Sequence, residues 1–283
     1  MKTRIISAII GVPLILLTLF FNRYFPLCVN ILCAIASLAC TVELLTAKAL
    51  IKDVKITAPC MLFAALLPML VPIGWWKVVA FLFVFYIFVL LIVKNQEYKF
   101  SDMSYILTAV CLTVFGLSCL AGACALDETH SVFYVTLCFV IAWVSDAGAY
   151  FVGSFLGKHK LCPNVSPKKT IEGAVGGVII GVIGAVVDAL VFQFIIFDGN
   201  VTINFIGVLV VAAIGTVTSI IGDLTFSLIK RSCKVKDYGN IIPGHGGILD
   251  RCDSIIMTAP MLFVFVQYFT VDFFTLRLKH VNS

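Results

Sequence analysis

Long apolar runs separated by short polar segments dominate this 283-residue chain. With about 20 apolar residues needed for one bilayer crossing, the runs predict nine membrane-spanning helices. Their expected bounds are 5–21, 25–47, 56–73, 77–93, 104–126, 131–156, 173–197, 203–228 and 254–273. The first run follows a basic start, as in a signal peptide, but no small-x-small cleavage site comes after it, so we expect a retained span. The pattern predicts an all-α polytopic membrane protein.

The basic residues predict how this bundle is oriented. With the N-terminus in the cytoplasm, 16 of the 20 Lys and Arg fall in cytoplasmic segments and four fall outside. Such an excess on one side is what the positive-inside rule describes. We therefore expect a cytoplasmic N-terminus, an outside C-terminus and cytoplasmic loops at 157–172 and 229–253. The chain would be a multi-pass protein of the cell membrane.

Composition narrows the class further. The chain is 61% hydrophobic and 12% charged, whereas soluble domains have about 45–50% apolar and about 25% charged residues. No basic run with interleaved aromatics indicates nucleic-acid binding. The eleven cysteines include no C-x-x-C pair, so we interpret them as small apolar residues and free thiols.

Charge is unevenly divided between the two halves of the chain. The first five spans carry almost no charge apart from Glu43, and the last four hold the rest. We therefore predict an N-terminal transmembrane scaffold at 1–126 and a C-terminal catalytic half at 127–283, which contains four helices and both long cytoplasmic loops.

The most polar stretch is 227–253, SLIKRSCKVKDYGNIIPGHGGILDRCD. It carries five Lys and Arg, three Asp, one His and four Gly. Lys and Arg bind phosphate oxygens, Asp binds a hard cation, and glycines let backbone N–H groups approach a ligand. A solvated cytoplasmic loop would explain the cations but not the GHGGILDRCD run. The stretch indicates a phosphate-rich ligand held with a divalent metal.

Helical spacing predicts which of these charges share a face. Asp223, Ser227 and Lys230 follow one another at i, i+4 and i+7, and Asp250 and Asp253 are three residues apart. If loop 229–253 folds back over the membrane face, Asp223 and Asp250 can converge on one cation. Water and phosphate oxygens would complete its coordination, as magnesium prefers.

A second polar segment precedes the seventh span. In its SPKKTIEG sequence, Lys168 and Lys169 offer charges for phosphates, and Thr170 can cap the next helix. Membrane topology alone would also explain the lysines. Asp146, in the sixth span, is either functional or hydrogen-bonded to a neighbouring helix. The glycine repeat after this segment, from Gly173, predicts close helix packing.

Written as a pattern, the polar stretch is S-x-I-K-R, four residues, K-D-x-G, two residues, then I-P-x-H-G-G-I-x-D-R-C-D. It resembles the signature of the phosphatidate cytidylyltransferases, also called CDP-diglyceride synthetases, and SPKKTIEG resembles the same family. Cys252 departs from the pattern, where the family usually shows a larger apolar residue or Thr. The resemblance covers roughly the C-terminal half.

The resemblance implies a magnesium-dependent, homodimeric enzyme of phospholipid synthesis that converts CTP and phosphatidate to CDP-diacylglycerol and pyrophosphate. It implies Asp223 and Asp250 as metal ligands and leaves room for a second, monovalent cation such as K⁺. The predicted catalytic residues are Asp223, Asp250, Lys169, Lys230, Arg231 and Asp253. The predicted substrate contacts are Asp146, Ser166, Lys168, Thr170, Ser227, Lys236, Asp237, His245, Gly246, Gly247 and Arg251.

Two other functions fit parts of the pattern. A related CTP-dependent lipid or polyprenol kinase needs the same phosphate and metal chemistry, and only its product, CDP, separates it. A transporter would also suit nine spans with acidic residues in the membrane. Charge clustered at one membrane face, and the lack of a visible inverted repeat, favour the enzyme.

Overall fold

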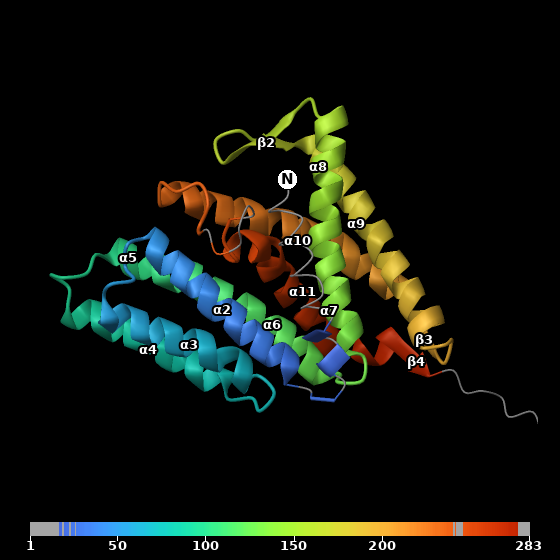
Figure 1. Ribbon diagram of the computed structural model, residues 1–283, viewed down its shortest axis with the longest axis horizontal. Helices are drawn as coiled ribbons and strands as arrows, with labels where there is room; N and C mark the ends of the chain where they lie inside the picture. The colour runs from blue at the N-terminus through green and yellow to red at the C-terminus, as the bar shows by residue number, and fades with distance from the viewer. Residues whose placement is uncertain are drawn as a thin grey trace, which may run out of the picture.

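The computed structural model describes residues 27–239 and 246–276, together with residues 17, 18, 20–22, 24, 25 and 241. Long helices form most of it (Figure 1). Within the described residues, six helical stretches are long and apolar enough to cross a membrane: Cys28–Ala47, Trp76–Val93, Phe100–Leu126, Ser131–Leu156, Ile171–Ile196 and Phe205–Ser232. The fold is that of a helical polytopic membrane protein.

The helices correspond well to the predicted apolar runs. In chain order they are α2 (Cys28–Ala47), α3 (Val54–Leu70), α4 (Trp76–Val93), α5 (Phe100–Tyr105), α6 (Cys111–Leu126), α7 (Ser131–Phe139), α8 (Ser145–Leu156), α9 (Ile171–Val191), α10 (Phe205–Ser232) and α11 (Leu249–Phe273). Short π-helical segments join α5 to α6 (η1, Ile106–Val110), join α7 to α8 (η2, Val140–Val144) and extend α9 (η3, Phe192–Ile196). The predicted span at 5–21 lies largely outside the described residues, so the count of nine stays a prediction.

Two short antiparallel sheets lie outside the helices, and the all-α prediction did not include them. Strand β1 (Lys160–Cys162) pairs with β2 (Ser166–Thr170), and β3 (Val201–Ile203) pairs with β4 (Phe274–Leu276). Strand β2 runs directly into α9, where the Oγ1 atom of Thr170 accepts a hydrogen bond from the Gly173 N–H at 3.1 Å. The predicted helix cap is therefore confirmed.

Glycines let α9 pack closely against its neighbours, as the glycine repeat predicted. A Cβ atom at Gly173 would lie 2.7 Å from the backbone oxygen of Ala149 in α8. One at Gly181 would lie 2.4 Å from the Cγ2 atom of Thr216 in α10. Because real side chains do not approach so closely, both helix contacts depend on glycine. Helix α9 is thus held against both α8 and α10.

Helix α11 joins the two halves of the chain. It packs against α10 and also against α6 of the first half (Figure 1). A Cβ atom at Gly116 of α6 would lie 2.3 Å from the backbone oxygen of Ile256, so these two helices are in close backbone contact. The buried apolar side chains of both halves form one continuous core.

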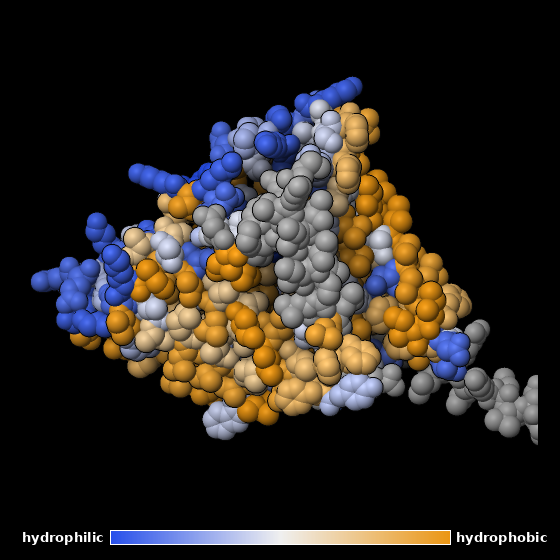
Figure 2. Space-filling view, viewed as in Figure 1, coloured by the Kyte–Doolittle hydropathy of each residue, from blue (hydrophilic) through white to orange (hydrophobic). Residues whose placement is uncertain are grey.

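The polar connections gather at one end of the bundle. Figure 2 shows hydrophilic residues along the edge formed by α5, the end of α10 and the β1–β2 hairpin, whereas hydrophobic residues cover the helix sides. At this edge Lys48, after α2, forms an ion pair with Asp102 of α5 at 3.3 Å. The loops predicted to be cytoplasmic thus share one end, as their alternation along the chain requires.

Candidate active site

Charged side chains from four elements lie close together near the polar edge of the bundle. Helix α8 supplies Asp146, strand β2 supplies Lys169, and the last turns of α10 supply Asp223 and Lys230. The first turns of α11 supply two further carboxylates, one of them Asp250. Since α8, α9, α10 and α11 pack against one another, residues more than 100 positions apart form one site.

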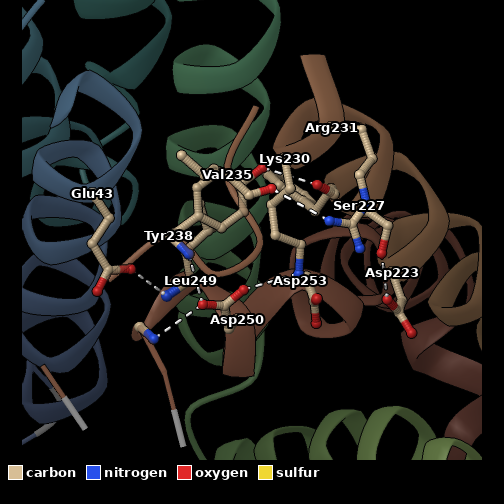
Figure 3. Close-up of polar contacts among 12 residues, drawn as sticks. Glu43, Asp223, Ser227, Lys230, Arg231, Val235, Tyr238, Leu249, Asp250 and Asp253 are labelled. Atoms are coloured by element: carbon tan, nitrogen blue, oxygen red, sulfur yellow. Dashed lines mark hydrogen bonds and ion pairs between the residues drawn. The ribbon is translucent and has the colours of Figure 1, made fainter. Parts of the chain in front are cut away.

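Asp250 is at the centre of a hydrogen-bond network (Figure 3). Its Oδ1 atom accepts a hydrogen bond from the Nζ atom of Lys230 at 2.9 Å. Its Oδ2 atom accepts hydrogen bonds from the backbone N–H groups of Tyr238 and Gly247, both at 3.0 Å. The Asp250 side chain is only 5% exposed and that of Lys230 only 12%. One buried carboxylate therefore connects α10, α11 and the loop between these two helices, which we call the polar loop.

Tyr238 supports this network from the loop. Its hydroxyl donates a hydrogen bond to the backbone oxygen of Phe226 at 3.0 Å, and the Nζ atom of Lys230 lies 5.5 Å from the ring centroid. Burial raises the pKa of Tyr238 well above its ordinary value, so its hydroxyl stays a neutral donor. Gly246 has a φ of +89°, and a Cβ atom there would lie 3.1 Å from Asp250 Oδ2, which explains the glycine.

Asp223 forms the second ion pair of the site. Its Oδ2 atom contacts the Nζ atom of Lys169, and its Oδ1 atom accepts a hydrogen bond from the Ser227 hydroxyl at 3.3 Å. The side chains of Lys169 and Asp223 are each 24% exposed. This pair brings the SPKKTIEG segment to the end of α10, so both polar segments of the sequence meet in one place.

Two more carboxylates lie close to Asp223. Asp253 is buried, with the charges of Asp223, Lys230 and Asp146 within electrostatic reach of its carboxylate. Asp146 accepts a hydrogen bond from the Ser254 hydroxyl at 2.7 Å through its Oδ2 atom. Three carboxylates from α8, α10 and α11 thus surround a region that also contains two lysines.

The donor set can be compared with what Mg²⁺ requires. Asp250 has both carboxylate oxygens engaged by N–H or ammonium donors, and Asp253 is the α11 carboxylate that interacts with Asp223. Within the described residues, no three His, Cys, Asp or Glu side chains form a metal site by themselves. Magnesium is commonly held by one or two carboxylates together with substrate phosphates. The residues fit such a shared site, and the Asp223–Asp250 metal pair stays a prediction.

The remaining predicted site residues, which are the catalytic candidate Arg231 and the other substrate contacts, lie around these buried groups. Lys168, Arg231, Lys236, Asp237 and Arg251 are exposed, Ser166 and Gly246 are half-buried, and Thr170, Ser227 and Gly247 are buried. The Nη1 atom of Arg231 lies 3.5 Å from the backbone oxygen of Val235, and the backbone oxygen of Arg251 accepts a hydrogen bond from Trp143 Nε1 at 3.3 Å. His245 lies outside the described residues.

Comparison with known proteins assigns the family. A model of the cytidylyltransferase family matches residues 2–269 of the chain. The chain belongs to this family. The family predicted from the two polar segments is therefore confirmed, and the match extends it into the first half of the chain.

Three proteins to which the chain is similar are named phosphatidate cytidylyltransferase. The protein of Bacillus subtilis (strain 168) is 42% identical over 143 residues, which cover 50% of this chain and 51% of the relative. That of Haemophilus influenzae is 40% identical over 146 residues, covering 50% and 47%. That of Staphylococcus haemolyticus is 35% identical over 171 residues, covering 60% and 62%. The chain spans about half the length of the first two relatives.

Sequence reasoning missed two groups that shape this site. Glu172 accepts hydrogen bonds from the backbone N–H groups of Lys158 and His159, at 3.0 and 3.2 Å, and so closes the β1–β2 hairpin. Glu43 accepts hydrogen bonds from backbone N–H groups at the start of α11. Its signal in the sequence was a lone carboxylate in an otherwise uncharged span.

Proposed function

We propose that this protein transfers a cytidylyl group from CTP to phosphatidate, giving CDP-diacylglycerol and pyrophosphate. The observation that carries the proposal is that the Lys169–Asp223 pair joins the SPKKTIEG segment to α10, the helix whose last turns also hold the Lys230–Asp250 pair of the other polar segment. The names of the relatives support the same reaction. A site rich in both lysines and carboxylates suits a reaction between two phosphate groups.

The proposed reaction depends more on positioning the substrates than on proton transfer. The phosphate of phosphatidate would attack the α-phosphorus of CTP, with pyrophosphate as the leaving group. Since the second pKa of a phosphate monoester is about 6, the nucleophile is already largely ionised at neutral pH. The protein must then hold two anions together and neutralise the charge that develops in the transition state.

The lysines and carboxylates would divide this work. Lys169 and Lys230 each contact a carboxylate, which they would exchange for phosphate oxygens of the substrates. Exposed Arg231 and its basic neighbours would attract CTP. Asp223 and Asp250 are the proposed ligands of Mg²⁺, which when bound neutralises phosphate charge. A second, monovalent cation such as K⁺ belongs to the same proposal.

The membrane arrangement belongs to the proposal as well. We propose nine spans with a cytoplasmic N-terminus and an outside C-terminus, so that the site faces cytosolic CTP. The polar edge of the bundle supports a common side for these loops (Figure 2), and their excess of Lys and Arg favours the cytoplasm as that side. Phosphatidate would enter sideways with its acyl chains still in the bilayer. The family resemblance also implies a homodimer.

The test is pyrophosphate release by the purified protein in detergent micelles with phosphatidate, CTP and Mg²⁺. We expect release to require both substrates and to fall by roughly 100-fold or more in Asp250→Asn, because a proposed ligand of the Mg²⁺ that neutralises transition-state charge is lost. Asp188→Asn is the matched control, since Asp188 lies within α9 and accepts a hydrogen bond from the Thr136 hydroxyl at 3.2 Å. It should keep wild-type turnover.

Other products would point to the other functions. Formation of CDP from a lipid alcohol, without pyrophosphate, would identify a kinase. Solute flux in proteoliposomes without CTP turnover would identify a transporter. Full activity in both Asp223→Asn and Asp250→Asn would show that the site is misplaced.

A further inference from the structure

Glu43 connects the first half of the chain to the start of α11. It lies in α2 and is only 3% exposed. Its Oε1 atom accepts a hydrogen bond from the Ile248 N–H at 2.9 Å. Its Oε2 atom accepts one from the Leu249 N–H at 2.8 Å (Figure 3). Both carboxylate oxygens are therefore used on one short stretch of backbone more than 200 residues away in sequence.

These two N–H groups are at the position where a helix needs a cap. The first N–H groups of an α-helix have no partner within the helix, and a side chain just before the helix normally accepts from them. Here the acceptor comes from another helix. The positive end of the α11 dipole stabilises the Glu43 carboxylate. In the described part of the chain, Glu43 forms no ion pair with a Lys, Arg or His side chain.

Glycines bring the polar loop up to the same carboxylate. A Cβ atom at Gly239 would lie 2.7 Å from Glu43 Oε1, and one at Gly247 would lie 2.5 Å from Oε2. The loop thus contacts Glu43 at two places, Gly239 and Gly247. Gly247 also donates its N–H to Asp250, so the backbone that Glu43 holds is the backbone that holds the central carboxylate.

We propose that Glu43 is a positioning residue of the active site. It fixes the start of α11 and contacts the polar loop at Gly239 and Gly247, so that Asp250 is presented to Lys230 and to the substrates. This inference rests on the proposed function, and it assigns to the first half of the chain a direct part in the catalytic geometry.

Hydrogen–deuterium exchange at the Ile248 and Leu249 amides tests the contact without any turnover. The variant is Glu43→Gln, which keeps one carbonyl acceptor but turns an NH₂ group toward the other N–H. We expect these two amides to exchange at least roughly tenfold faster than in wild type, because protection is lost when local opening becomes easier. Asp188→Asn, which also neutralises a carboxylate in a span, should leave both amides unchanged.

Kinetics then separate positioning from mere support of the fold. Losing a group that orients a ligand-binding residue typically costs roughly 10–100-fold in activity. We expect kcat of Glu43→Gln to fall by that factor per folded molecule, with KM for CTP nearly unchanged. Glu43→Asp, which keeps the charge on a shorter side chain, should recover part of kcat. A purely structural role would change the unfolding temperature and the folded fraction but not kcat per folded molecule.

Unchanged exchange at both amides, or a wild-type kcat in folded Glu43→Gln, would overturn the inference. If wild-type protein itself releases no pyrophosphate, the proposed function fails, and the exchange measurement alone decides whether Glu43 holds α11. Should Glu43→Gln not fold, Gly239→Ala replaces it, because its methyl group would push against Oε1. In Gly239→Ala, the same two amides must then exchange faster than in wild type, and kcat per folded molecule must fall.

Discussion

Replacing Lys230 with Met tests whether the central ion pair holds the polar loop in place. The Lys230 Nζ and Asp250 Oδ1 atoms are 2.9 Å apart, and both side chains are nearly buried. At an effective dielectric constant of about 20, two unit charges at this distance attract each other by about 6 kcal/mol. Desolvation offsets much of that, and removing one partner of a buried pair usually costs about 3–5 kcal/mol.

Two features place Lys230→Met at the lower end of that range. Asp250 keeps its two hydrogen bonds from backbone N–H groups, and Met retains the apolar stem of the lysine. We therefore expect the free energy of unfolding to fall by about 3 kcal/mol. In the double variant Lys230→Met/Asp250→Asn no charge is left unpaired, so about 1–2 kcal/mol should return.

The assay is unfolding by SDS in mixed micelles, followed by far-UV circular dichroism. Lys94→Met serves as the control, because Lys94 pairs with Glu97 at 2.6 Å between half-exposed side chains and its loss should not shift the midpoint. If Lys230→Met unfolds at the same SDS concentration as Lys94→Met, the ion pair does not hold the loop. A double variant less stable than Lys230→Met would likewise refute the coupling.

Two further predictions concern other parts of the fold. Gly181→Ala should lower the free energy of unfolding by about 1–3 kcal/mol in the same SDS titration, because its methyl group would collide with Thr216 across the α9–α10 contact. In the connection between α6 and α7, burial raises the pKa of Asp127. The hydrogen bond and charge of His130 outweigh this effect of burial and lower the pKa of Asp127 overall. Its contribution to stability is therefore present above the unfolded pKa of about 3.9 and lost as pH falls through the folded value. The stability difference between wild type and Asp127→Asn, measured from pH 7 to pH 3, should shrink toward acid.

Local features of the fold could be read from the sequence because their signals are local. The apolar run at 25–47 became α2, and the run at 203–228 became the longest helix, α10, with its end four residues further on. The Thr170 cap and the Gly181 contact follow from residue types at fixed spacings, which act within one helix turn or one helix face.

The sequence could not predict which charged side chains pair across helices. Spacing placed Asp223 and Lys230 on one face of α10, yet each side chain pairs with a different segment, Lys169 in one case and Asp250 in the other. Which neighbour a face meets depends on how α8, α9 and α11 pack, and the period of a helix does not contain that information. The closeness of Asp253 to Asp223 has the same origin.

The position of Glu43 shows what hydropathy alone could not predict about the first half of the chain. A loop with glycines at 239, 246 and 247 has little side-chain packing with which to fix its own path, and ordering it costs backbone entropy. A carboxylate on a packed helix such as α2 offers rigid acceptors for that loop, and burying it is tolerable because two N–H groups and a helix dipole meet it. With the role proposed for Glu43, the polar segments near α10 and α11 do not complete the site by themselves, because α2 supplies the acceptors for the first N–H groups of α11.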